Sequence, residues 1–70
     1  MDESLLQVVE RAGGWGILDD GKPIFWFPEK DSALATARVM ADARCLFTGK
    51  ATRVHAQGEH GNFELVFAYS

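Results

Sequence analysis

Cysteine and long apolar runs are scarce in this chain of 70 residues. Cys45 is its only cysteine, so no disulfide can form within the chain, and a free thiol fits a reducing compartment. No apolar run approaches the roughly 18 residues of a membrane-spanning helix. The chain starts Met-Asp-Glu-Ser, which is acidic where a signal peptide is basic. We therefore expect a cytoplasmic protein without a membrane partner.

Positive charge is also in short supply. Seven Lys and Arg residues stand against ten Asp and Glu residues, which gives a formal net charge of −3. Such a field favours solubility and discourages contact with a phosphate backbone. We therefore do not expect nucleic acid to be a general partner.

Apolar and aromatic residues are plentiful by contrast. Hydrophobic residues make up 47% of the chain and include five Phe, two Trp and one Tyr, which is too apolar for a disordered segment. A chain this short has material for one core, so we expect residues 1–70 to form a single domain. A domain of this size buries only about 60% of its unfolded surface, so self-association is the expected supplement to its stability.

The first half of the sequence predicts extended segments joined by turns. Residues 5–11 contain β-branched side chains and too few polar ones for a surface helix, and the turn Ala12-Gly13-Gly14 follows them. Residues 15–19 form the next extended segment, and Asp20-Gly21 has the composition of a tight hairpin turn. Residues 24–27 then complete the predicted strands before the helix.

Good helix formers dominate residues 32–46. Asp31 or Ser32 is the expected N-cap, because either side chain can accept hydrogen bonds from free amides of the first turn. Thr48-Gly49 is expected to end the helix. Small and apolar side chains recur at three- and four-residue spacing and form the predicted buried stripe: Ala33, Leu34, Ala37, Met40, Ala41 and, at its end, Cys45.

The last third of the sequence predicts a second hairpin. In residues 52–57 the predicted buried side chains are Thr52, Val54 and Ala56, and the solvated ones are Arg53, His55 and Gln57. Residues 58–62 form the loop. In the following strand one face is predicted to carry Phe63, Leu65, Phe67 and Tyr69, and the other Glu64, Val66 and Ala68. We expect Leu34, Ala37 and Ala41 to face Val54, Leu65 and Phe67.

Together these elements predict an α+β fold in the order β-β-α-β-β. Its antiparallel sheet has four to five strands, and one helix packs on one face. A single helix cannot cover both faces of a sheet, so the opposite face is expected to stay open.

Candidate catalytic and metal-binding residues are few. Cys45, His55 and His60 lie in no catalytic motif, and Cys45 fits a small buried position in the helix. Glu59 lies between the two histidines, and two imidazoles with one carboxylate make a known ligand set. Their spacing matches no established zinc pattern, and such residues are ordinary in a hairpin turn. We therefore expect no enzymatic activity, no metal and no cofactor.

The aromatic residues of the first half suggest an interaction surface. Alternation places Phe25 and Phe27 on one face and Ile24 and Trp26 on the other, so one set is exposed unless the edge strand curls to bury both. The candidate interface residues are Phe25, Trp26, Phe27, Val66 and Arg53. We expect a non-enzymatic interaction module that forms a homodimer, or binds a protein partner, through the open face or an edge strand.

The alternative use of the same sheet is to bind single-stranded nucleic acid. Bases would stack on the aromatic side chains, and Arg11, Lys50 and Arg53 would contact phosphates.

A series of short elements also follows a recognisable order: Gly13-Gly14-Trp15, Asp20-Gly21, Ala33, Ala37-Arg38, Ala41, Val54-His55 and the glycine-containing turn 58–61. In this order they resemble a family of short bacterial proteins known as domain of unknown function 2188, and the resemblance spans nearly the whole chain. Residues 25–28 and 45–50 depart from the family pattern. The resemblance implies a β-β-α-β-β domain and brings no activity, cofactor or catalytic residue with it.

Overall fold

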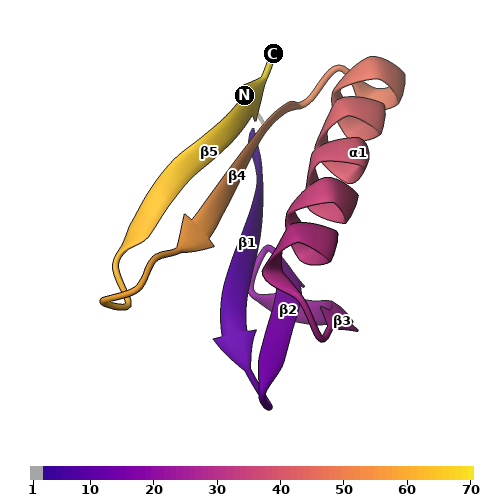
Figure 1. Cartoon of the computed structure of the whole chain (residues 1–70). Coiled ribbons are helices and arrows are strands. Elements are labelled where there is room, and N and C mark those ends of the chain that lie inside the picture. Colours follow the sequence, from indigo (N-terminus) through magenta and orange to yellow (C-terminus); the bar gives the residue numbers. More distant parts are fainter. Residues whose placement is uncertain (1–2) are drawn as a thin grey trace.

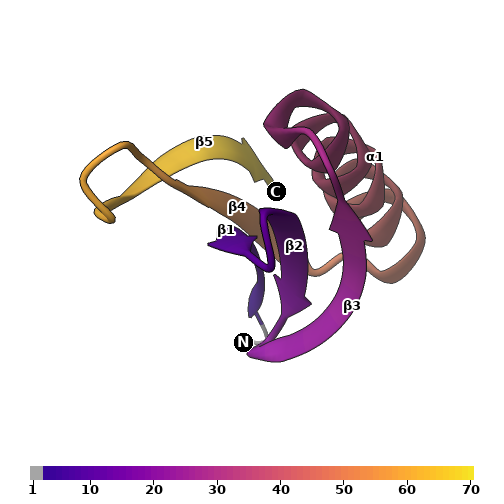
Figure 2. The same ribbon diagram turned by 60° about the horizontal axis from the view of Figure 1, so that its bottom comes forward.

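A computed structural model describes residues 3–70, which form five strands and one helix (Figure 1). In chain order these are β1 (Glu3–Arg11), β2 (Gly14–Asp19), β3 (Lys22–Phe27), α1 (Lys30–Thr48), β4 (Ala51–Gln57) and β5 (Phe63–Tyr69). The strands form one sheet in the order β3-β2-β1-β4-β5, and α1 lies across one face of it (Figure 2). The predicted α+β class with one helix packed on the sheet is confirmed.

The sheet is mixed, whereas the sequence led us to expect antiparallel pairing throughout. β1 and β4 are parallel, and the other three neighbouring pairs are antiparallel. Three strands precede the helix, so β1 and β3 run in the same direction. Because α1 returns the chain to the end at which β3 began, the next strand also runs in that direction and pairs with β1 in parallel.

The two hairpins before the helix have the tight turns that the sequence predicts. Ala12-Gly13 joins β1 to β2, and Asp20-Gly21 joins β2 to β3. All four residues have positive φ, between 52° and 87°. This backbone conformation matches the right-handed twist of the flanking strands.

Three alanines of α1 are fully buried, as the predicted stripe requires: Ala33, Ala37 and Ala41. They pack against sheet side chains that have no exposed surface, chiefly Leu6, Val8, Ile17 and Val54. Leu34 and Met40 are partly buried beside this cluster. Because alanine side chains are short, the helix can approach a sheet that carries larger branched residues.

The expected N-cap is wrong. The N-cap residue is Glu29, which is extended and makes no side-chain capping bond, and α1 begins at Lys30, before Asp31 and Ser32. The first turn is tied to the sheet instead, because Nζ of Lys30 donates to the carbonyl oxygen of Gln57 at 3.0 Å. The opposite end agrees with the prediction: Gly49 has a φ of 73° and donates its N–H to the carbonyl oxygen of Cys45.

A β-bulge changes the faces of β5. Val54 pairs with Phe67, but the next residue, His55, pairs with Leu65, so Val66 is the extra residue. The expectation that Leu65 faces the helix is therefore wrong. Its side chain lies on the opposite face and is 56% exposed. The bulge changes the alternation at Val66, so Phe63 and Leu65 lie on the face away from α1 whereas Phe67 lies on the helix side, as predicted.

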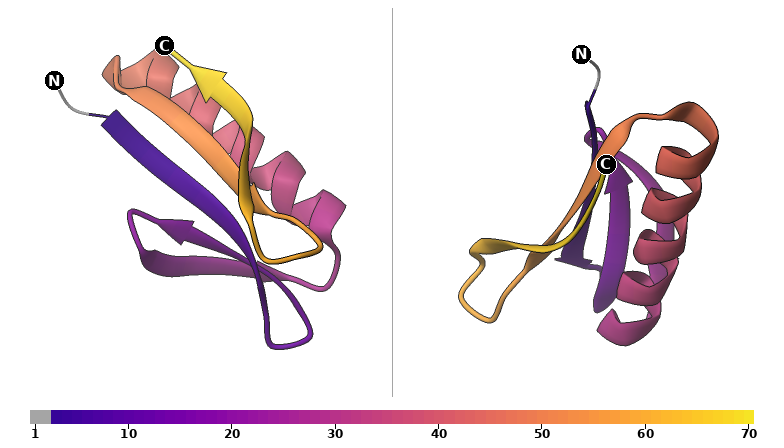
Figure 3. Two further views of the ribbon diagram at one scale, coloured as in Figure 1. Left: turned by 90° about the vertical axis from the view of Figure 1, so that its left-hand side faces the viewer. Right: turned by 90° about the horizontal axis from the view of Figure 1, so that it is seen from above.

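The molecule is elongated, with principal extents of 34 × 19 × 19 Å. The turn between β4 and β5 projects away from α1, and this is clearest in the right-hand view of Figure 3. Among residues 3–70, no helix combines the length and apolar character needed to cross a membrane.

Candidate functional site

The residues predicted to form one interface lie on different parts of the sheet. Phe25 and Phe27 pair with Ile17 and Trp15 and so lie on the α1 side. Phe27 packs against the core, whereas the side chain of Phe25 is 51% exposed. Trp26 lies on the opposite face and is 47% exposed. β3 therefore leaves Phe25 and Trp26 about half exposed on opposite faces of the sheet, while Phe27 is partly buried against the core.

The other two predicted residues lie beyond the centre of the sheet. Val66 is the bulge residue of β5, at the edge opposite β3. Arg53 lies on the face away from α1, where its Nη2 is 3.6 Å from Oε1 of Glu3. The predicted set is thus divided between two edges, and it does not form one patch.

The two edge strands differ in how far they are protected from pairing. β3 contains Lys22 and Pro23, and its register with β2 shifts at Ile17 and Leu18, which leaves Ile24 as the extra residue. It also curves towards the start of α1 (Figure 2). Lysine, proline and bulges on an edge strand all hinder pairing with another chain.

β5 also contains a bulge, but it lacks the lysine and proline found in β3. It is seven residues long, has no proline and carries one charged side chain, Glu64. Three of its apolar side chains are exposed: Phe63, Leu65 and the bulge residue Val66. Within the described part of the chain no strand pairs with its outer side. Its outward N–H and C=O groups therefore form a template for one more strand.

The sheet face away from α1, called the open face below, is mixed in character. Its apolar side chains, from the strand register, are Leu5, Val9, Leu18, Trp26, Phe63 and Leu65. Its polar side chains are Gln7, Arg11, Arg53, His55 and Gln57, with Glu3 at its end. No other described element covers this face (Figure 3).

Trp26 lies close to the backbone of Gly14 on the open face. Its Nε1 donates to the carbonyl oxygen of Arg11 at 2.9 Å. A Cβ atom at Gly14 would lie 2.4 Å from Cζ2 of the indole, so only glycine allows this approach. The side chain of Arg11 similarly covers Gly16. The result is an indole held in place, with a cationic side chain beside it.

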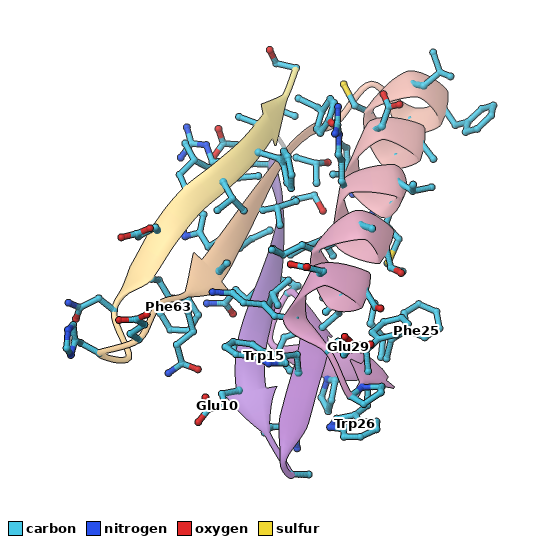
Figure 4. All side chains as sticks on the ribbon, viewed as in Figure 1. Glu10, Trp15, Phe25, Trp26, Glu29 and Phe63 are labelled. Carbon is cyan, nitrogen blue, oxygen red and sulfur yellow. The ribbon has the colours of Figure 1, made fainter. Side chains whose placement is uncertain are left out.

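A shallow apolar recess of about 290 Å³ adjoins this indole. It is lined by Arg11, Ala12, Pro23, Ile24, Phe25 and Trp26. Figure 4 shows Phe25 and Trp26 at this end of the molecule.

A second recess, of about 320 Å³, is polar and lies near the end of α1. At its centre Arg44 binds Asp19 in a bidentate manner, with N–O distances of 2.9 and 2.7 Å, and also donates to Oγ of Ser4. The hydrogen bond from Arg44 lowers the pKa of Asp19, and burial opposes it; the same bond raises the pKa of Arg44. No sequence pattern singled out Arg44. Because its donors are used within the fold, its role is to hold α1 on the sheet.

The residues weighed as catalytic or metal-binding are separated. Cys45 is half-buried in α1, His55 is half-buried on the open face and His60 is exposed in the turn after β4. Across residues 3–70, no three His, Cys, Asp or Glu side chains gather where they could hold a metal ion.

Comparisons with known proteins found no match: no protein-family model, no curated protein and no solved structure is similar to the chain. The resemblance to domain of unknown function 2188 therefore stays a prediction from the sequence.

Proposed function

We propose that the protein is a non-enzymatic interaction module that forms a closed homodimer through the outer edge of β5. The observation that carries the proposal is the state of this edge: a seven-residue strand without proline, with exposed Phe63, Leu65 and Val66. Long apolar edges of this kind pair readily with another strand.

A second copy of β5 fits this edge better than β3 of a second copy does. Pairing β5 with β5 joins identical surfaces, so the assembly closes after two chains. Pairing β5 with β3 would be head-to-tail and would leave free edges that continue into a fibre. Pro23, Lys22 and the bulge of β3 oppose that second arrangement.

A stable dimer needs more surface than the backbone edge of β5 alone. A standard interface covers roughly 800 Å² on each partner, about a sixth of the 4674 Å² of accessible surface on this chain. The backbone of one strand supplies only part of that area. The exposed side chains of Leu65 and Val66 add to it, so the same contact enlarges a core that is small for a monomer.

The experiment is sedimentation equilibrium on three proteins at micromolar concentration. The native chain is expected at twice its 7.7 kDa mass. Leu65→Lys combined with Val66→Lys puts two positive charges on the edge of each copy, so this variant is expected at the mass of one chain. Phe47→Lys is the control, because Phe47 lies on α1 and is 82% exposed. It is expected to stay dimeric.

Circular dichroism checks that both variants keep the native fold. A native chain that sediments at 7.7 kDa would contradict the homodimer. A dimeric Leu65→Lys/Val66→Lys variant would show that the interface lies elsewhere, and a monomeric Phe47→Lys variant would place it on α1.

A further inference from the structure

The charge of the open face differs in sign from that of the whole chain. The chain has a formal net charge of −3. The open face carries Arg11 and Arg53, and Glu3 is the acidic residue that we find on it within residues 3–70. The remaining strand acids pair with residues of the α1 side: Glu10 with Trp15, Asp19 with Leu6 and Glu64 with Ala56. The net charge of −3 therefore does not describe this face.

The pair between Arg53 and Glu3 leaves the guanidinium accessible. The two side chains are 56% and 59% exposed and are 3.6 Å apart. Exposed ion pairs of this kind contribute little to stability and open readily in water. An incoming phosphate can therefore take the place of the Glu3 carboxylate.

Aromatic side chains stand at both ends of one row across this face. Trp26 pairs with Gly16, Gly16 with Val9, and Phe63 with Gln57 on the other side. Figure 4 shows Trp26 and Phe63 on opposite sides of β1. They are separated by four strand spacings, about 19 Å along the sheet at about 4.8 Å per strand.

We propose that the open face binds single-stranded nucleic acid, with bases stacking on Trp26 and Phe63 and phosphates contacting Arg11 and Arg53. Every base has a π-face, so an indole that is fixed on glycine backbone offers a stacking platform for any sequence. A duplex keeps its bases stacked inside and cannot use that platform. All four side chains belong to one copy, so this inference does not rest on the homodimer.

The test is a fluorescence anisotropy titration with a labelled oligothymidylate of about 12 nucleotides, within the range of site sizes known for such folds. The native chain is titrated at several salt concentrations. Arg11→Gln combined with Arg53→Gln is expected to reduce the slope of log affinity against log salt by about 1.4, or 0.7 for each lost phosphate contact. Trp26→Leu keeps an apolar side chain over Gly14 and is expected to lower affinity about tenfold, the loss of one stacked base.

Lys22→Gln is the matched control, because it removes one positive charge from the α1 side, where Lys22 pairs with Asp19. It is expected to leave the salt slope unchanged. The proposal is overturned if the native chain produces no anisotropy change, if a duplex of equal length binds as well, or if Lys22→Gln lowers the slope by about 0.7, the value of one lost phosphate contact. A Trp26→Leu variant that is monomeric but binds the oligonucleotide as before would show that the open face is a protein interface and would contradict the proposal.

Discussion

At the scale of single residues, Arg44 and Asp19 form a bidentate ion pair between α1 and the sheet. Two hydrogen bonds join them across the gap between α1 and β2, and both side chains are about three-quarters buried. The sequence could not reveal this pair. Asp19 precedes an Asp-Gly turn and Arg44 lies beside the alanine stripe, so each has an ordinary local explanation, and only the packing of α1 on the sheet brings them together.

The first prediction concerns this pair. The folded state lowers the pKa of Asp19, so below about pH 4 the unfolded chain binds more protons than the folded chain, and stability falls as pH falls. Asp19→Asn is expected to cost about 1–2 kcal/mol at pH 7 and to flatten the loss of stability below pH 4. Urea unfolding at pH 7, 4 and 3 measures both effects.

Asp42→Asn is the control for that measurement, since Asp42 is an exposed carboxylate on α1, the helix that carries Arg44. If the stability of Asp19→Asn and of the native chain falls in parallel with acid, Asp19 does not supply the pH dependence.

At the scale of elements, features that depend on neighbouring residues were predicted correctly from the sequence, whereas the β-bulges were not. The turns at Asp20-Gly21 and Gly49 and the stripe at Ala33, Ala37 and Ala41 depend on neighbours in sequence, and the structure has them where they were expected. The bulge in β5 left no such signal. The alternation of residues 63–69 favours a regular strand with Phe63, Leu65, Phe67 and Tyr69 on one face, whereas the bulge places Phe63 and Leu65 on the open face.

The second prediction belongs to this scale and tests the buried stripe of α1. Ala37 is fully buried between α1 and the sheet, so Ala37→Glu would bury a charge without a partner. We expect it to destabilise the domain by more than about 3 kcal/mol, which a small domain cannot tolerate. Thermal unfolding by circular dichroism is the measurement.

Ala35→Glu makes the same substitution on the exposed side of α1 and is expected to change stability by no more than about 0.5 kcal/mol. Equal melting temperatures for Ala37→Glu and Ala35→Glu would mean that the buried face of α1 is assigned incorrectly.

At the scale of the whole molecule, the open face and the outer edges of β3 and β5 have no covering element among residues 3–70. Composition alone predicted that one helix would leave a face open. The parallel pairing of β4 with β1 was missed because the predicted order β-β-α-β-β has two strands before the helix, whereas three strands precede α1. Alternation placed Phe25 and Trp26 on different faces, where the structure has them, but it could not show that Val66 lies at the opposite edge of the sheet.

Amide hydrogen exchange at two protein concentrations tests the proposed dimer most directly, because it reports on β5 itself. About half of the β5 amides point away from β4 and are bonded only if a second copy pairs with this edge. We predict that protection within residues 63–69 rises with protein concentration, while protection within residues 22–27 of β3 does not change. Protection of β5 that is independent of concentration, or a rise confined to β3, would contradict pairing through β5.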